Sequence, residues 1–409
     1  MPNLCASPQP AQGIVRCERM LLLAAMFLAA LAKLWLSLNT YGTNDITSWK
    51  RFADQIYPDG LFTIYATDDQ FNHPPAVAMA LWLLGRGVEA AGDWFPFFFR
   101  LPAILADTGS AYLVWKFALH YLPSRTRLFL VLVFALNPVS VMVSGFHGNT
   151  DPIFTFLILA SAFILVYKSA PALAGCIFGL ALNVKIVPLL LLPAFYFWLQ
   201  DWKSRVRFGS GAAVVFLAGF ALHFSRVPND ILHNVFGYDS FGGFWGISRL
   251  LGNPEWFSGV AKLLILLLVI GFSYFATSVN RQSPRLNSTG TRHGEDLIRA
   301  IGGTYIIFLV LTSGFGVQYL VWLLPFSVFW GRFHLVYTTF SSCFIFFCYT
   351  YWSGGLPWNY ANSWEPGGPL VLYNFSVLAG LLTWLSLLLL FFKEAGHTIR
   401  ISSRANRLQ

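Results

Sequence analysis

Long apolar runs separated by short polar segments are the dominant pattern of this chain. Most of the runs reach roughly 17 residues, the shortest length with which a helix crosses about 30 Å of hydrocarbon. Backbone polar groups inside a bilayer must pair within the protein, so these runs are predicted to be helices. We therefore predict an all-α, polytopic integral membrane protein. About ten full transmembrane helices are expected, at residues 20–38, 97–119, 128–145, 152–168, 208–224, 259–279, 297–313, 317–331, 335–352 and 370–392.

Two apolar stretches do not have the length of a single span. Residues 74–84 are too short to cross, so they predict a re-entrant or interfacial helix. Residues 172–199 are too long for one span and are interrupted by Lys185 and Pro188. This interruption predicts a broken hairpin with Lys185 at its tip.

Composition and charge agree with a membrane protein. Of the 409 residues, 56% are hydrophobic and 11% are charged, against about 25% charged in an average soluble domain. The net charge of +9 comes from Lys and Arg that gather in alternate connecting segments, which is the positive-inside pattern. This distribution predicts that both termini are cytosolic and argues against a nucleic-acid partner. It also favours the re-entrant helix, because a crossing at residues 74–84 would place the next basic clusters outside.

The chain is interpreted as a single membrane-embedded domain, residues 1–409. It has an outer loop at 39–96, a polar cytosolic linker at 280–296 and a cytosolic tail at 393–409, and its first apolar run is interpreted as a retained signal anchor. The sequence has no nucleotide-binding loop and no His/Cys metal motif. Any chemistry is therefore expected at the outer membrane surface, without a cofactor.

Polar residues gather in two outer segments. The first contains "GTNDITSW", in which Asp45 lies just after the first span and close to Trp49. Low dielectric at this depth is expected to raise the pKa of Asp45 towards that of a working base. The second is "FHGNTDPIF", which places His147, Asn149 and Asp151 within five residues. Here the alternatives are a structural His147 and an Asp151 that only caps the next helix.

A few charged residues fall inside or at the ends of the apolar runs. Arg100 opens the second span, and Lys185 marks the predicted hairpin tip. Charges at membrane depth usually face a cavity or a partner, although Arg100 is also placed to snorkel to the interface. Lys33 and Asp107 lie within spans, where a structural pair and a role in chemistry are both open.

The ordered set of these motifs resembles the GT-C superfamily of membrane glycosyltransferases, in particular its mannosyltransferase-like and aminoarabinose-transferase-like members. The likeness covers roughly residues 20–330. The matching segments are "GTNDITSW", "FNHPPAV", "RLPAILAD", "GNTDPIF", "GLALNVKIVPLLLLP" and "FGVQYLVWLLPF". Through these motifs, His73, Gln318 and Tyr319 join the candidate substrate-binding residues. Some members have Asp-x-Asp in the first loop, whereas here Asn44 precedes Asp45; a divalent metal is therefore possible but not favoured.

The resemblance implies transfer of a sugar from a polyprenyl-phosphate donor to an acceptor hydroxyl, with inversion at the sugar carbon. Asp45 is the expected general base and Asp151 the rival base. Arg100 and Lys185 are expected to hold the donor phosphate, and His147 and Asn149 to bind substrate, in one outer cavity roofed by residues 39–96. The acceptor (lipid, glycan or protein) stays open, as does the choice between the cell membrane and the endoplasmic reticulum. The competing hypothesis is a transporter or lipid flippase, because Pro-broken helices and buried charges fit that class too.

Overall fold

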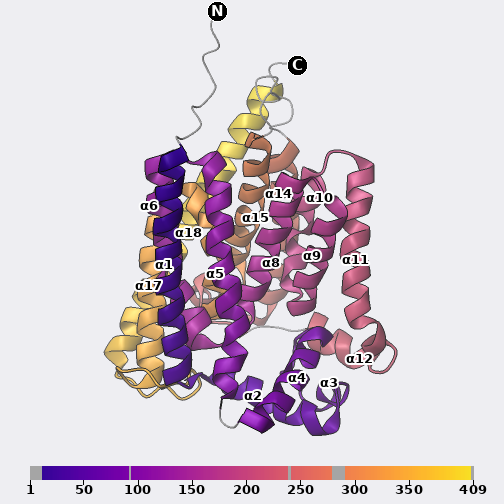
Figure 1. Ribbon diagram of the computed structural model, residues 1–409, viewed down its shortest axis with the longest axis vertical. Coiled ribbons are helices and arrows are strands. Elements are labelled where there is room, and N and C mark those ends of the chain that lie inside the picture. Colours follow the sequence, from indigo (N-terminus) through magenta and orange to yellow (C-terminus); the bar gives the residue numbers. More distant parts are fainter. Residues whose placement is uncertain (1–11, 92–93, 238–240, 279–290, 407–409) are drawn as a thin grey trace, which may run out of the picture.

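The computed structural model describes residues 12–91, 94–237, 241–278 and 291–406. Long helices run side by side along the longest axis, and a group of shorter helices lies across one end (Figure 1). Two strands of two residues each, β1 (Gly42–Thr43) and β2 (Tyr360–Ala361), pair in parallel at that end. The chain is therefore an all-α polytopic membrane protein with one small strand pair.

Among the described residues, nine segments of long helix make up the membrane layer. They are α1 (Gln12–Asn39), α5 (Phe95–Tyr121), α6 (Ser124–Ala135) continued by α7 (Pro138–Met142) and η1 (Val143–His147), α8 (Asp151–Phe163) continued by η2 (Ile164–Lys168), α11 (Trp202–Phe224), α14 (Glu255–Ser278), α15 (Thr291–Leu311), α17 (Arg332–Ser353) and α18 (Leu370–Asn406). Within the described residues, seven of these segments are long and apolar enough to cross a membrane. The predicted number of about ten is not reached by this criterion.

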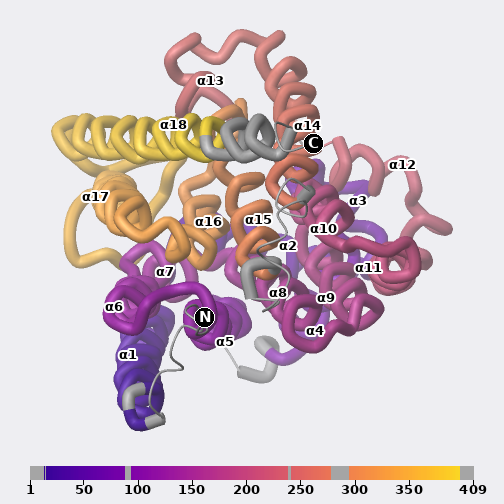
Figure 2. The backbone as a smooth tube through the Cα atoms, turned by 90° about the horizontal axis from the view of Figure 1, so that it is seen from above, coloured from indigo at the N-terminus to yellow at the C-terminus, as the bar shows by residue number. Residues whose placement is uncertain are grey.

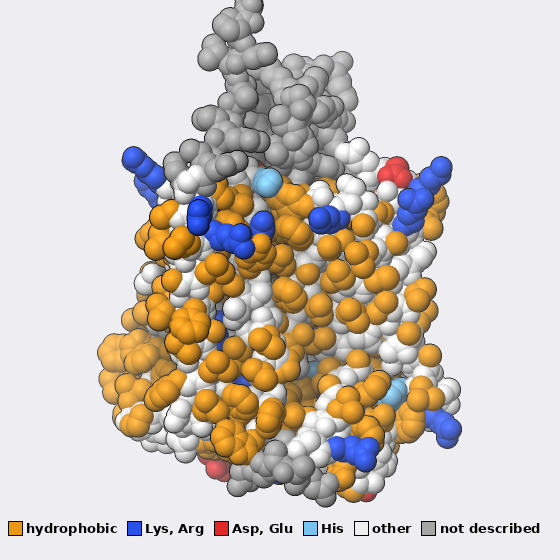
Figure 3. All heavy atoms as spheres, in the orientation of Figure 1, with side chains coloured by type: hydrophobic (Ala, Val, Ile, Leu, Met, Phe, Trp, Pro, Cys, Tyr) orange, Lys and Arg blue, Asp and Glu red, His pale blue; other side chains and the backbone are white. Residues whose placement is uncertain are grey.

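The sides of the molecule carry large apolar side chains that face outward. Trp35, Leu105, Val214 and Leu389 are each more than 60% exposed, and apolar side chains cover most of the face seen in Figure 3. An exposed apolar surface of this extent fits a lipid surrounding better than water. Lys and Arg side chains lie around the upper rim of the same view, which agrees with the uneven distribution of charge in the sequence.

The chain turns back inside this layer at two places. The first is α9 (Pro171–Val184), followed by η3 (Val187–Leu191) and α10 (Leu192–Trp198). Lys185 between them has extended backbone, and Phe178 of α9 lies 5.2 Å from Phe195 of α10 between ring centroids. The predicted broken hairpin with Lys185 at its tip is therefore confirmed.

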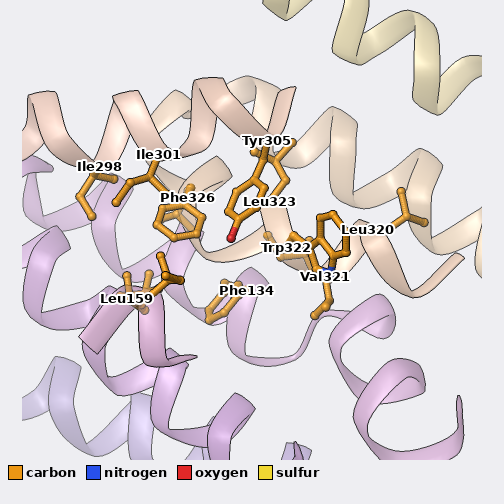
Figure 4. Close-up of a cluster of buried hydrophobic side chains, with 14 of the residues drawn as sticks. Phe134, Leu159, Ile298, Ile301, Tyr305, Leu320, Val321, Trp322, Leu323 and Phe326 are labelled. Atoms are coloured by element: carbon orange, nitrogen blue, oxygen red, sulfur yellow. The ribbon is translucent and has the colours of Figure 1, made fainter. Parts of the chain in front are cut away.

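The second turn-back was not predicted. Instead of a full span at 317–331, the structure has η7 (Val317–Tyr319), α16 (Leu320–Ser327) and η8 (Val328–Trp330), a segment too short to cross. Every residue of α16 is buried, and Figure 4 shows Trp322, Leu323 and Phe326 packed among side chains of other helices. Burial in protein explains an apolar run as well as burial in lipid does, so the sequence pattern does not separate the two.

The outer loop folds into short helices at the end opposite to the start of α1. They are α2 (Asn44–Asp59), α3 (Thr63–Thr67) and α4 (Pro75–Ala91). A later part of the chain contributes three more short helices, α12 (Pro228–Ile231), η4 (Leu232–Phe236) and α13 (Gly246–Leu250). The helix predicted at 74–84 corresponds to α4, which is longer than predicted. It lies with α2 and α3 at the lower end in Figure 1 and is not among the seven candidate spans.

The two ends of the described chain lie together. The first turn of α1 and the last turns of α18 are at the upper end in Figure 1, and Figure 2 looks down on that end. Residues 279–290 of the predicted linker lie outside the described residues, and residues 291–296 are the first turns of α15. The predicted tail continues α18 as far as Asn406. Which side is cytosolic stays a prediction.

Lys33 and Asp107 form a structural ion pair. Lys33 Nζ on α1 bonds Asp107 Oδ2 on α5, and both side chains are almost fully buried. The hydroxyls of Ser140 and Ser144 donate to the same carboxyl oxygen. A methyl group at Gly145 would lie 2.8 Å from Lys33 Cα, so α1 packs here against η1 at a distance that only glycine allows. Of the two alternatives for this pair, the structural one is confirmed.

Candidate functional site

A single large cavity collects most of the candidate residues. Its volume is ≈ 1290 Å³, above the roughly 300–1,000 Å³ of an ordinary small-molecule pocket. Its walls come from α2, the segment before α4, the end of η1, α13, α14, α17 and α18. The two turn-backs, at Lys185 and at residues 314–319, also line it. Seven predicted site residues reach this cavity: Asp45, His73, His147, Asn149, Lys185, Gln318 and Tyr319.

Asp45 lies in the first turn of α2 and is held from two sides. Thr43 caps the helix, and its hydroxyl accepts a hydrogen bond from Asp45 N at 3.3 Å. His147 Nε2 lies 3.0 Å from Asp45 Oδ2, and Asn149 Nδ2 donates to the same oxygen at 2.8 Å. Within the described chain, Oδ1 accepts no hydrogen bond, and the side chain is 29% exposed. One oxygen is therefore fixed by the protein while the other is available to a ligand.

The pKa of Asp45 shifts in the direction opposite to the prediction. Burial alone would raise it, but the electrostatic interaction with His147, the hydrogen bonds from His147 and Asn149, and the charge of Lys185 lower it below its usual value. Donors that bind the charged form of a carboxyl group stabilise that form. The expected raised pKa is therefore wrong, and Asp45 is ionised at neutral pH.

Asp151 lies behind Lys185 and holds it in place. Its side chain is fully buried, and its Oδ1 accepts from Lys185 Nζ at 2.8 Å and from Trp322 Nε1 at 2.8 Å. Thr150, not Asp151, occupies the cap position of α8, so the capping interpretation is not supported. Lys185 reaches the cavity, whereas Asp151 is separated from it.

Lys185 combines an ion pair with an aromatic surrounding. Its side chain is 14% exposed, and its Nζ lies 5.1 Å from the ring centroid of Tyr319 and 5.4 Å from that of Trp322. Of its three N–H donors, one is used by Asp151 within the described chain. The cation is thus oriented by the protein but keeps donors for an anion in the cavity.

His73 lies against the start of α2. Its ring packs on Trp49 with centroids 4.3 Å apart, and its backbone carbonyl accepts from the Tyr65 hydroxyl at 2.7 Å. Burial, reinforced by the charge of Lys185 and opposed by Asp45, lowers the pKa of His73 to about 3. His73 is therefore neutral at physiological pH and offers hydrogen bonds, not charge.

Arg100 is not part of the cavity. Its buried guanidinium donates to backbone carbonyls at the end of α1, to Thr40 O at 3.1 Å, to Ser37 O and to Tyr41 O. Carbonyls at a helix C-terminus lack intrahelical partners and carry partial negative charge, so a cation stabilises them. Gly42, with φ of +110°, leaves the space that this side chain fills. Arg100 therefore stabilises the segment before Asp45, and the structure places it outside the cavity in which we expected the phosphate.

Two residues that contact the site residues were missed by the sequence analysis: Trp322, which lines the cavity, and Tyr349, which lies behind His147. Trp322 binds Asp151, and a buried indole N–H needs an acceptor, so its presence in "QYLVWLLP" was an available signal. Tyr349 on α17 hydrogen-bonds His147 Nδ1 at 2.8 Å. No local pattern marks Tyr349, because it is one aromatic residue among many in an apolar helix. Within the described residues, no group of three or more His, Cys, Asp or Glu is arranged to hold a metal ion.

Known proteins to which this chain is similar include one family and one curated relative. Residues 17–245 match the family described as PIG-U, GPI transamidase subunit PIG-U. A stretch of 109 residues is 31% identical to GPI mannosyltransferase 1 of Dictyostelium discoideum, over 26% of this chain and 24% of that relative. The chain thus matches about a quarter of the length of this curated relative. The family match includes Asp45 and Lys185 and ends before Gln318 and Tyr349.

Proposed function

The chain belongs to the PIG-U family of GPI transamidase subunits, and on that premise we propose that it binds a polyprenyl-phosphate sugar in its cavity and transfers the sugar to an acceptor hydroxyl. The observation that carries the proposal is the pairing of Asp45 and Lys185 in one cavity. Lys185 contributes to the lowered pKa of Asp45, so the two charges interact across that space. The similarity to a GPI mannosyltransferase supports mannose as the sugar.

In the proposed reaction, Asp45 Oδ1 takes the proton from the acceptor hydroxyl. The acceptor oxygen attacks the anomeric carbon from the face opposite the phosphate, and the carbon–oxygen bond to the phosphate breaks. The electron pair of that bond stays on the polyprenyl phosphate, which leaves as an anion. The configuration at the sugar carbon is inverted in this single displacement.

Lys185 stabilises the negative charge that grows on the leaving phosphate. A cation that the protein already holds in place stabilises the charge that develops in a transition state more than it stabilises the ground state. Asp151 and Trp322 hold Lys185 from behind, so little reorganisation is needed during the reaction. His73 and Asn149 provide neutral hydrogen-bonding groups for sugar hydroxyls at the same end of the cavity.

A second candidate function follows from the family description as a subunit. In this alternative the cavity binds a lipid-linked sugar phosphate and presents it to another protein, and Asp45 orients a hydroxyl without removing its proton. The same residues serve both functions, so only product formation separates them.

The test uses the purified full chain in detergent, where transport across a membrane is impossible. It is incubated with polyprenyl-phosphate sugars, mannose first, and with glycolipid acceptors, and free polyprenyl phosphate and the new glycosidic bond are measured. Replacing Asp45 with Asn removes the base, and loss of a general base costs about 10²–10⁴-fold in rate. Donor binding, measured separately, should persist.

Asp54→Asn is the matched control, because Asp54 is an exposed carboxylate on the same helix, paired with Lys50. It should leave turnover unchanged. Asp151→Asn, tested beside it, should weaken donor binding through Lys185. Donor binding by the wild-type chain without any product would establish the second candidate, and wild-type turnover in Asp45→Asn would reject Asp45 as the base.

A further inference from the structure

Both ring nitrogens of His147 are engaged. Nε2 lies 3.0 Å from Asp45 Oδ2, and Nδ1 lies 2.8 Å from the Tyr349 hydroxyl oxygen. His147 and Tyr349 are buried, Tyr349 completely. The three side chains form a row that runs from the inside of α17 to the cavity wall.

The chemistry of the row determines where its protons lie. An ionised Asp45 only accepts hydrogen bonds, so His147 must carry a proton on Nε2. If Nδ1 were protonated as well, the Tyr349 hydroxyl would accept from it, and its own proton would have no acceptor among the described residues. A buried donor without a partner costs about 1–3 kcal/mol. The arrangement in which Tyr349 donates to an unprotonated Nδ1 satisfies every group.

Tyr349 itself has little freedom to move. Its ring contacts Phe146, Trp352 and Trp358, with centroids 5.2, 5.7 and 5.8 Å away.

The segment that follows α17 also holds the backbone beside Asp45, because β2 pairs with β1. Ser363 N and Oγ both donate to Asn44 Oδ1 at 3.0 Å. The C-terminal third of the chain thus supports Asp45 through its backbone and through His147.

We propose that Tyr349 is a positioning residue, whose hydroxyl fixes the Nε2–H tautomer of His147 and so directs that proton at Asp45 Oδ2. Asp45 Oδ1 is thereby left in place for the acceptor. The inference rests on the proposed function for its effect on turnover, but the tautomer of His147 is a property of the folded protein alone.

The first measurement is ¹⁵N NMR of the full chain labelled at histidine and reconstituted in lipid nanodiscs. The His147 signals are identified as those missing from His147→Gln. The wild-type protein should show a protonated Nε2 and an unprotonated Nδ1. A His147 protonated at Nδ1, whether neutral or cationic, would overturn the proposal whatever the activity of the protein.

The second measurement uses Tyr349→Phe, which removes only the hydroxyl. His147 should then show a mixture of protonation states. Turnover should fall by roughly two- to tenfold, which corresponds to one lost hydrogen bond. The acid limb of the pH–turnover profile should move to higher pH, because a His147 that no longer always directs its proton at Asp45 stabilises the carboxylate less. The other titratable groups that face Asp45, Lys185 and His73, stay the same.

Tyr337→Phe is the matched control. Tyr337 lies on the same helix, is equally buried and donates its hydroxyl to Leu320 O at 2.7 Å, away from His147. It should leave the His147 spectrum and the pH profile unchanged. An unchanged His147 spectrum in Tyr349→Phe would refute the positioning role. A wild-type chain with the expected tautomer but no sugar transfer would refute the proposed function and leave the positioning role standing.

Discussion

Two Lys–Asp pairs lie at membrane depth in this molecule, and their surroundings differ. Lys33 and Asp107 have side chains that are 2% and 4% exposed, and Ser140 and Ser144 add further donors to the carboxylate. Lys185 is 14% exposed beside a large cavity, and its partner Asp151 is fully buried behind it.

The difference separates a structural pair from a candidate binding group. A charge pair without access to solvent or ligand can only join helices, and Lys33–Asp107 joins α1 to α5. A cation that has N–H donors open to a cavity can bind an anionic ligand there in addition to its carboxylate partner. The two pairs use the same residue types, so access decides which one can take part in chemistry.

Replacing Lys33 with Met should have the largest effect on stability. It leaves Asp107 as an unpaired buried charge, and removing one partner of a buried pair costs about 3–5 kcal/mol. The free energy of unfolding in detergent and the folded fraction in size-exclusion chromatography measure the loss. Lys203→Met, at an exposed position on α11, is the control and should have little effect.

The double variant Lys33→Met/Asp107→Asn sharpens the same comparison. It removes both charges while the Asn side chain still accepts from the two serine hydroxyls. Most of the lost stability should return, because buried ion pairs contribute little beyond what a neutral replacement does. A double variant as unstable as Lys33→Met would mean that the pair itself, and not the orphaned charge, stabilises the fold.

Replacing Lys185 with Met should act mainly on function. Loss of one fixed group that stabilises developing charge costs roughly 10²–10³-fold in turnover, and donor binding should weaken as well. The loss of stability should be smaller than for Lys33→Met. Lys185 lines the cavity, so shortening its side chain lets water reach Asp151, whereas the Lys33–Asp107 pair has no such access.

Lys116→Met is the matched control for Lys185. Lys116 also lies over aromatic rings, 5.3 Å from the Trp115 centroid and 5.5 Å from that of Tyr112, but it is remote from the cavity lining. Its replacement should preserve donor binding. Equal effects of the two substitutions on donor binding would remove Lys185 from the proposed site.

The sequence predicted the membrane fold and seven of the residues that reach the cavity, because both depend on local signals. Apolar length marks helices, and polar residues at span ends are rare enough to notice. The distinction between Arg100 and Lys185 was out of reach. Both are single cations bordered by apolar sequence, and the carbonyls that engage Arg100 lie 59 to 63 residues earlier in the chain.

The direction of the Asp45 pKa shift was missed for a related reason. Burial beside Trp49 is visible in the sequence and predicts a raised pKa. The donors that reverse the shift, His147 and Asn149, are 102 and 104 residues away. Only the fold brings them to the carboxylate.

Replacing Asn149 with Ala should have the smallest of these effects, and it tests that reversal. Asn149 Nδ2 stabilises the ionised form of Asp45, so its loss raises the pKa of Asp45. Because the pKa of Asp45 is lowered in the wild type, Asp45 becomes protonated only at low pH. Activity is therefore lost as the pH falls through that pKa. In the variant this loss should begin at a higher pH. A hydrogen bond to a charged group contributes about 1.5–3 kcal/mol. The free energy that corresponds to the shift of the Asp45 pKa should not exceed this value.

The pH dependence of turnover is the measurement, with Asn72→Ala as control. Asn72 lines the same cavity but is not a hydrogen-bond partner of Asp45. Its replacement should leave the acid limb where the wild type has it, even if substrate binding changes. His73, neutral because its pKa is about 3, should add no limb near neutral pH in any of the three proteins. An acid limb that moves to lower pH in Asn149→Ala would mean that the Asn149 amide does not stabilise the ionised Asp45 carboxylate. The argument for Asp45 as the base of the cavity site would then fail.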